Sequence, residues 1–143
     1  MRKYIQTFVV AATAAIAMAA PRAAQAQDFK VVVNSANAVD ALTADEASKI
    51  FLKQAPKFAN GTTAAPVDQK GAVRASFTKA VHGKAVAAVD TYWQQQIFSG
   101  KEVPPAVKNS DDDVIAYVKS NPGGIGYVTA GASTAGVKVV AIK

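Results

Sequence analysis

The residues with the clearest chemical potential lie where a short loop leads into a predicted helix. Lys70, Gly71, Ala72 and Arg74 follow a predicted strand at residues 64–67. The first amides of a helix have no partner inside the helix, and a glycine lets a ligand approach the backbone closely. Such amides, with two cations beside them, would suit an oxyanion. A helix start with two ordinary surface cations is the alternative, and the residue types leave both interpretations open.

His82 is the only histidine in the sequence, so any catalytic triad or histidine metal site would depend on it. It stands beside Gly83, at the predicted end of a helix, where a capping or solvent-facing ring is the better interpretation. Neither a nucleotide-binding glycine motif nor a nucleophile-elbow motif occurs. We therefore expect no enzymatic activity and no cofactor.

Three successive aspartates at residues 111–113 raise the question of a metal site. Consecutive helical residues point in different directions around the axis, so these carboxylates would not converge on one ion. Ser110 is a typical N-cap residue, and acidic side chains stabilise the first turn of a helix. We interpret the run as a solvated first turn and expect no metal ion there.

Residues 1–26 are typical of a signal peptide. Arg2 and Lys3 precede a nearly apolar run at residues 7–20, and Ala24-Gln25-Ala26 fits a cleavage site. The run is too short to span about 30 Å of hydrocarbon comfortably. We predict cleavage near Ala26 and export to the periplasm.

The remainder, residues 27–143, is long enough for one domain with a hydrophobic core and too short for two. Three of the 16 basic residues lie in the leader, which leaves 13 basic against 10 acidic residues and a net charge of +3. The basic residues are not clustered among aromatic ones, so we expect no nucleic-acid binding and only a weak preference for anions. Cysteine is absent, which excludes disulfides. Packing must therefore supply the stability.

The pattern of apolar residues predicts alternating strands and helices. Strands are expected at residues 30–33, 64–67, 125–129 and 137–142, and helices after Thr43, at 73–81, at 85–98 and after Ser110. Thr43 and Glu46 form a predicted capping box. This order indicates an α/β domain with one small mixed sheet flanked by helices.

A single hydrophobic core is expected to join the apolar stripes of these helices. The residues predicted to be buried together are Phe51, Phe77, Trp93, Ile97 and Val118. Trp93 and its aromatic neighbours would otherwise form a binding patch, but their helical spacing favours core packing.

Several segments together resemble the substrate-binding proteins of phosphate ABC transporters. They are residues 42–46, 50–52, 60–67, 74–77, 92–93, 97–101, 104–105 and 121–128. The run Pro-Gly-Gly-Ile-Gly-Tyr-Val at residues 122–128 is the most specific of them. The resemblance spans most of the chain after the leader, and it implies a single-lobe, type II periplasmic binding protein-like fold.

Full members of that family have two lobes that close on an oxyanion, and a hydroxyl-rich Asp-Gly-Ser-Gly-Thr loop supplies donors. This sequence has about one lobe, and residues 69–73 read Gln-Lys-Gly-Ala-Val at the corresponding place. The resemblance implies a phosphate-like anion bound by Lys70, Gly71, Ala72 and Arg74, and a transporter or sensor as partner. A homodimer would be one way to enclose the ligand. An interaction module that retains the lobe fold without a ligand is the alternative.

Overall fold

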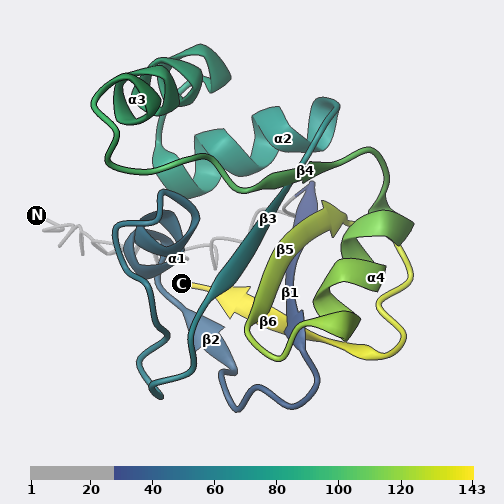
Figure 1. The fold of residues 1–143 in the computed structure, drawn as a ribbon. Coiled ribbons are helices and arrows are strands. Elements are labelled where there is room, and N and C mark those ends of the chain that lie inside the picture. The colour runs from purple at the N-terminus through teal and green to yellow at the C-terminus, as the bar shows by residue number, and fades with distance from the viewer. Residues whose placement is uncertain (1–27) are drawn as a thin grey trace, which may run out of the picture.

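The computed structural model describes residues 28–143, and the predicted signal peptide lies outside the described residues. A six-stranded mixed sheet forms the centre, with helices on both faces (Figure 1). The strands are β1 (Phe29–Asn34), β2 (Ala41–Leu42), β3 (Ala65–Gln69), β4 (Ala106–Lys108), β5 (Gly124–Thr129) and β6 (Val137–Ile142). Their order across the sheet is β2-β6-β1-β5-β3-β4. The predicted small mixed sheet is therefore confirmed.

Strand directions divide the sheet into two parts. β1 is antiparallel to both of its neighbours, β5 and β6. β3 runs parallel to β5 on one side and to β4 on the other. β1 is buried over most of its length, which explains its continuous run of apolar residues.

The helices are α1 (Ala44–Phe51), α2 (Ala72–Phe77), α3 (Val86–Phe98) and α4 (Asp111–Ser120), and a π-helical turn, η1 (Thr78–His82), extends α2. The predicted capping box is present at the start of α1, where Glu46 N donates to Thr43 Oγ1 over 3.1 Å and Thr43 N donates to Glu46 Oε2 over 2.8 Å. Within residues 28–143, every helix is too short or too polar to span a bilayer.

The prediction of one shared core is wrong, because the sheet separates the buried residues into two layers. Side chains alternate between the two faces of a strand, so Val31 and Val33 of β1 point to the face covered by α1 and α2. Val32 points to the opposite face, which α4 covers. Phe51 and Phe77 belong to the first layer, whereas Val118 belongs to the second.

The other two predicted core residues lie on α3. Trp93 is buried in a small third cluster with Leu52 and Val89. Ile97 is 54% exposed, and its predicted burial is wrong. The buried stripe of α3 passes through Val89 and Trp93, which leaves Ile97 at its edge without a covering element among the described residues.

An aromatic cluster fixes α2 to the sheet. The ring of Phe77 stacks on Tyr127 of β5, with centroids 3.9 Å apart, and its edges meet Phe51 at 4.7 Å and Phe29 at 5.5 Å. Phe77 and Tyr127 are both fully buried. These contacts hold the carboxyl end of α2 against β5.

Candidate functional site

The carboxyl ends of β3, β4 and β5 meet at one edge of the sheet, because these three strands are parallel. From β3 the chain enters α2 on one face, and from β4 it enters α4 on the other (Figure 1). Ligands of α/β sheets bind where successive connections leave for opposite faces. We call this region the carboxyl edge and define it as residues 68–74, 108–111 and 127–129.

The four predicted anion-binding residues all lie at the carboxyl edge. Asp68 and Gln69 belong to β3, so the connection to α2 is shorter than the predicted loop. Lys70 N donates to Lys108 O over 3.0 Å, which holds the β3–α2 and β4–α4 connections side by side. Lys70, Gly71 and Ala72 are exposed.

The start of α2 has no capping side chain. Gly71 is its N-cap residue and has a φ of 101°, a conformation that L side chains rarely adopt. A glycine here satisfies the backbone geometry, but it has no oxygen with which to accept from the first amides. The amides of Ala72 and Val73 are therefore free of a capping side chain at an exposed helix start.

Arg74 is already paired with two carboxylates. Its Nη2 donates to Asp90 Oδ1 over 2.7 Å, and its Nε lies 3.5 Å from Asp68 Oδ2. Sequence reasoning placed Arg74 at the site but did not identify either partner. Asp90 is on α3, 16 residues further along the chain, and no local spacing rule connects the two. An anion at the start of α2 would compete with Asp90 for the guanidinium.

Asp68 is held by its surroundings at the end of β3. Tyr127 Oη donates to Asp68 Oδ1, and Gln69 N donates to the same oxygen over 2.9 Å. Burial raises the pKa of Asp68 above its ordinary value, against the opposing attraction of Arg74. The carboxyl edge therefore contains a negative group beside its cations.

Gln69 and Asp111 connect the ends of β3 and β5 to the start of α4. Gln69 is 4% exposed, and its Nε2 donates to Tyr127 O and to Asp111 Oδ1, each over 3.0 Å. Asp111 also accepts from Thr129 N over 2.9 Å and from Thr129 Oγ1 over 2.5 Å. Burial by itself would raise the pKa of Asp111, but the hydrogen bonds from Thr129 and Gln69 outweigh it and lower the pKa.

The aspartate run does begin a helix, as predicted, with Ser110 Oγ accepting from Asp113 N over 3.2 Å. Asp112 and Asp113 are exposed. Asp111 has a further role that its position in the run did not reveal, because it links α4 to the ends of β3 and β5. A bond to Gln69, 42 residues away, has no signal in the local sequence.

His82 occupies a different environment from the predicted capping or solvent-facing one. Its Nδ1 lies 2.7 Å from Ser48 Oγ, and its ring meets the face of Phe77 edge-on, with centroids 5.5 Å apart. Burial, together with the nearby charge of Lys84, lowers the pKa of His82 to about 4. The ring is therefore neutral at pH 7, and it fastens η1 to α1.

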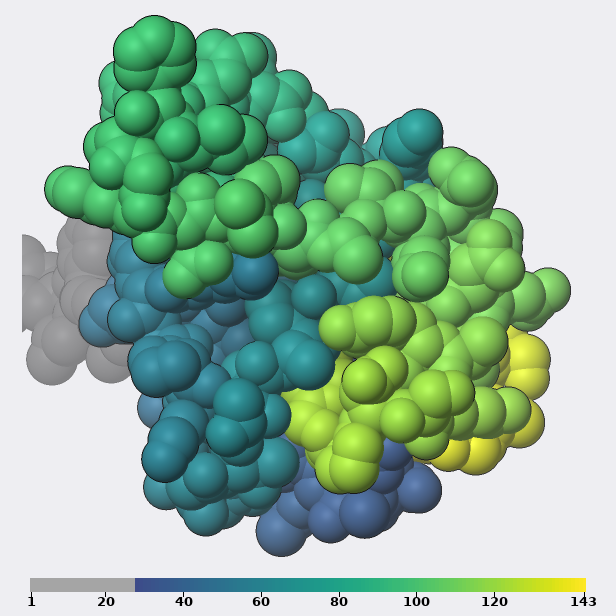
Figure 2. All heavy atoms as spheres, viewed as in Figure 1, coloured from purple at the N-terminus to yellow at the C-terminus, as the bar shows by residue number. Residues whose placement is uncertain are grey.

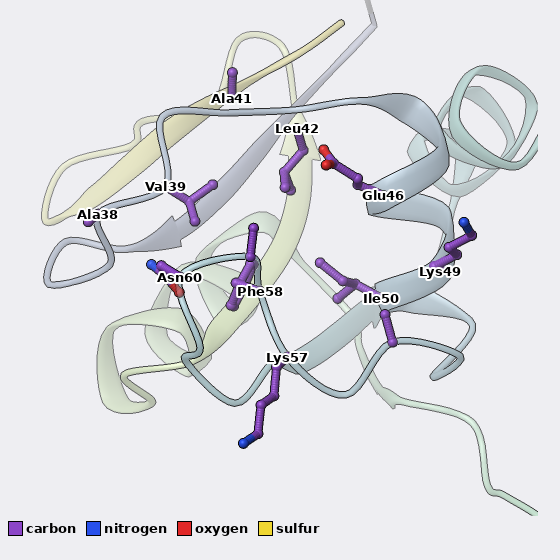
Figure 3. Close-up of a pocket in the computed structure, with 12 residues that line it drawn as sticks. Ala38, Val39, Ala41, Leu42, Glu46, Lys49, Ile50, Lys57, Phe58 and Asn60 are labelled. Atoms are coloured by element: carbon purple, nitrogen blue, oxygen red, sulfur yellow. The ribbon is translucent and has the colours of Figure 1, made fainter.

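A separate hollow of about 380 Å³ lies between α1 and the segment at residues 55–60 (Figure 3). Its inner wall is apolar and includes Leu42, Ile50 and Phe58. In Figure 3 the amino groups of Lys49 and Lys57 point away from its centre. None of the four predicted site residues lines it. This hollow does not gather donors for an anion, so the carboxyl edge remains the candidate site.

No protein-family model matches the chain, and no curated protein matches it. Solved structures do match. An ABC-type phosphate transport receptor from Vibrio cholerae is 20% identical with a TM-score of 0.54, over 79% of this chain and 45% of that one. A protein from Clostridium perfringens solved with bound phosphate is 15% identical with a TM-score of 0.59, over 79% and 44%. PstS from Borrelia burgdorferi is 10% identical with a TM-score of 0.56, over 81% and 47%.

The chain spans less than half the length of each of these proteins. The similarity covers 79% or more of this chain in each case. At these identities the likeness concerns the fold. The predicted fold is confirmed: the chain has the α/β fold of phosphate-type periplasmic binding proteins, over about half of their length.

Proposed function

We propose that this protein is an exported solute-binding-like protein whose carboxyl edge binds a phosphate-like oxyanion. The observation that carries the proposal is the uncapped start of α2 beside Lys70 and Arg74. The phosphate-binding proteins that share the fold support the choice of ligand class. Their transport role supports a transporter or sensor as the partner of this chain.

The chemistry follows from the donors at this site. Free first-turn amides and the positive end of a helix dipole attract anions, and a guanidinium presents two parallel N–H groups to an oxyanion. Asp90, whose side chain is 49% exposed, would give way to the ligand at Arg74 Nη2. Releasing a half-exposed carboxylate to water costs little, because an exposed ion pair contributes about 1 kcal/mol or less.

The same geometry predicts a low affinity for the oxyanion. Residues 69–73 bring no hydroxyl donors to the site, and Lys70, Gly71 and Ala72 are exposed to solvent. An anion that stays partly hydrated gains little from each hydrogen bond. We expect a dissociation constant in about the millimolar range, equivalent to roughly −4 kcal/mol, and weaker binding at high salt.

The test is an NMR titration of the purified protein with phosphate and with sulfate. The amides of Ala72 and Val73 should shift with a millimolar midpoint, and Arg74→Ala should remove the shift without unfolding the protein. Lys57→Ala is the matched control, since Lys57 lies before the amino end of β3, at the opposite edge of the sheet. Loss of binding in both variants would indicate that the anion is attracted by the overall positive charge and is not bound at the start of α2. The absence of any shift in the unaltered protein would refute anion binding.

Export is a separate part of the proposal. The signal peptide at residues 1–26 would be removed near Ala26, and the product at 27–143 would reside in the periplasm. Mass spectrometry of a periplasmic fraction tests this step. A product that retains Met1 in the cytoplasm would contradict it.

The second candidate is an interaction module without a small ligand. The observation that favours it is the pairing of Arg74 with both Asp68 and Asp90, which offsets the positive charge of the guanidinium. The titration separates the two candidates, because a module of this kind would give no phosphate-dependent shift at the start of α2.

A further inference from the structure

Among the four α-helices of residues 28–143, α3 has the smallest share of buried residues. Of its 13 residues, Val89 and Trp93 are buried, and they form a small cluster with Leu52. Tyr92 Oη adds a hydrogen bond to Leu52 O over 3.0 Å. Figures 1 and 2 show α3 projecting from one corner of the molecule, at the upper left. One side of this helix packs against Leu52, and the other faces solvent.

Three large apolar side chains at and after the end of α3 are exposed to solvent. Phe98 is 97% exposed, Ile97 is 54% exposed and Val103 is 58% exposed. Single exposed apolar residues are common on protein surfaces, but a group of them marks an interaction site. A nearly fully exposed phenylalanine has the largest apolar area to gain from a partner.

The outward stripe of α3 is formed by residues at helical spacing. Thr91, Gln94, Gln95 and Phe98 recur at i, i+3, i+4 and i+7, so they lie on one side of the helix. Together with Ser99 they line an open hollow of about 510 Å³. We call Thr91, Gln94, Gln95 and Phe98 the α3 face.

The α3 face carries no charge. Asp90 is the one charged residue in α3, and it is paired with Arg74. Residues 91–100 contain no charged side chain, although residues 28–143 carry 13 basic and 10 acidic ones. Protein interfaces are depleted of charge at their centre and enriched in aromatic residues. The α3 face has no charge and carries one large aromatic side chain, Phe98.

We infer that the α3 face is the contact surface of a homodimer. In a two-fold symmetric contact the same patch meets itself, so any charge on it faces a like charge. An uncharged stripe on a net basic protein avoids that repulsion. A membrane surface is a poorer occupant, because amphipathic helices that bind lipid carry Lys and Arg beside their apolar face.

The spacing of the stripe suggests how the copies meet. Thr91 and Phe98 are equally far along the helix from the midpoint between Gln94 and Gln95. Two antiparallel α3 helices related by a two-fold axis at that midpoint would place each Phe98 against Thr91 of the partner subunit. The glutamine amides would then exchange hydrogen bonds across the axis.

The expected affinity is modest because the contact is small. A helix of 13 residues is about 20 Å long, and one stripe of it buries less than the roughly 800 Å² per partner of a standard interface. A dissociation constant on the order of 10–100 µM is reasonable for such a contact. The dimer would form at high local concentration and dissociate on dilution.

Sedimentation equilibrium of the purified protein over a range of about 1–500 µM tests the inference. The mass should rise from monomer to dimer, and Phe98→Asp should weaken dimerisation at least about tenfold. Val139→Asp is the matched control, because Val139 is 44% exposed on β6, away from α3. The measurement is made in buffer without phosphate or sulfate, so the fate of the anion site does not affect this result.

A cross-linking experiment locates the axis. The chain contains no cysteine, so Gln95→Cys introduces a single thiol. Mild oxidation should give a disulfide-linked dimer of this variant and none of Val139→Cys. A monomer at every concentration, a dimer that is indifferent to Phe98→Asp, or equal cross-linking of both cysteine variants would overturn the inference. Binding of a different protein to a monomeric α3 face would overturn it as well.

Discussion

α2 and α3 follow one another in the chain, yet they are attached to the sheet very differently. α2 has six residues, and its Val73 and Phe77 are both buried, with Phe77 at the centre of the aromatic cluster. α3 has 13 residues and buries Val89 and Trp93 in a cluster of its own. A helix stabilises a protein mainly through the apolar surface that it buries. The short helix is therefore part of the core, and the long one is attached to its side.

The two helices also differ in what they offer to a ligand. The start of α2 combines free amides with Lys70 and Arg74, which suits a small anion. The α3 face is uncharged and ends in an exposed phenylalanine, which suits another protein surface. Arg74 and Asp90 form the one ion pair between the two helices. Substitutions on α2 and on α3 should therefore have different effects on stability and on binding.

The largest effect is expected for the residue that anchors α2. Phe77→Ala removes a fully buried ring that contacts four other aromatic side chains, and it should lower the free energy of unfolding by about 3–5 kcal/mol. Urea denaturation monitored by circular dichroism measures the change. Phe98→Ala on α3 is the control and should stay within about 0.5 kcal/mol. Equal losses would remove the distinction between the two helices.

The anchor of α3 should behave differently. Trp93→Ala deletes the largest side chain of a three-residue cluster, so α3 should detach while the sheet stays folded. We expect a loss of about 2–3 kcal/mol that is confined to α3. Hydrogen exchange measures it: amides in α3 should lose protection, and those of β1 should keep it. Loss of protection in β1 to the same degree would show that α3 belongs to the core.

The pH dependence of stability should reveal the half-buried imidazole of His82, at the end of η1. The unfolded chain protonates His82 near pH 6.5, whereas the folded chain does so only near 4. The contribution of neutral His82 to stability is therefore fully present above about pH 6.5, and it is lost as the pH falls toward 4. The full shift corresponds to about 3 kcal/mol, and partial exposure of the ring reduces the expected loss to about 1–2 kcal/mol. His82→Gln should flatten this part of the stability curve, and an unchanged curve would contradict the burial of the ring.

The smallest effect concerns the ion pair that joins the two helices. Asp90→Ala leaves Arg74 with Asp68 alone, so an anion no longer competes with a second carboxylate. Phosphate affinity should rise about threefold, in line with a half-exposed pair. The NMR titration of Ala72 and Val73 measures it. Asp112→Ala, on an exposed aspartate of the α4 start, serves as the charge-matched control, and an equal rise in both variants would point to net charge alone.

Predictions based on neighbouring residues succeeded because the forces involved act over a few residues. The Thr43 capping box needs only a side chain three positions away, and it is present. The apolar run at residues 30–33 indicated a strand, and β1 is present in the middle of the sheet. The four predicted site residues lie together because a strand-to-helix connection keeps them adjacent, and anion binding by them stays a prediction.

Apolar periodicity was less reliable for burial. It indicated which side of a helix is apolar, but it did not indicate whether another element covers that side. Ile97 continues the stripe of Val89 and Trp93 by one turn and is exposed, because the cluster that covers this side of α3 does not extend beyond Trp93. The separation of Phe77 from Val118 likewise depends on a sheet that stands between them.

The sequence by itself determined the helices, four of the six strands, the caps at Thr43 and Ser110 and the mixed α/β character, since these depend on propensity, periodicity and short spacing. The short strands β2 and β4 have too few residues to show a pattern of their own. The tertiary structure alone decided which distant side chains form hydrogen bonds with one another. Tyr127 meets Asp68 across 59 positions, and Gln69 meets Asp111 across 42. Such pairs form only when strand order brings the ends of β3 and β5 together. The charge available to a ligand at Arg74, and the uncovered face of α3, both follow from that packing.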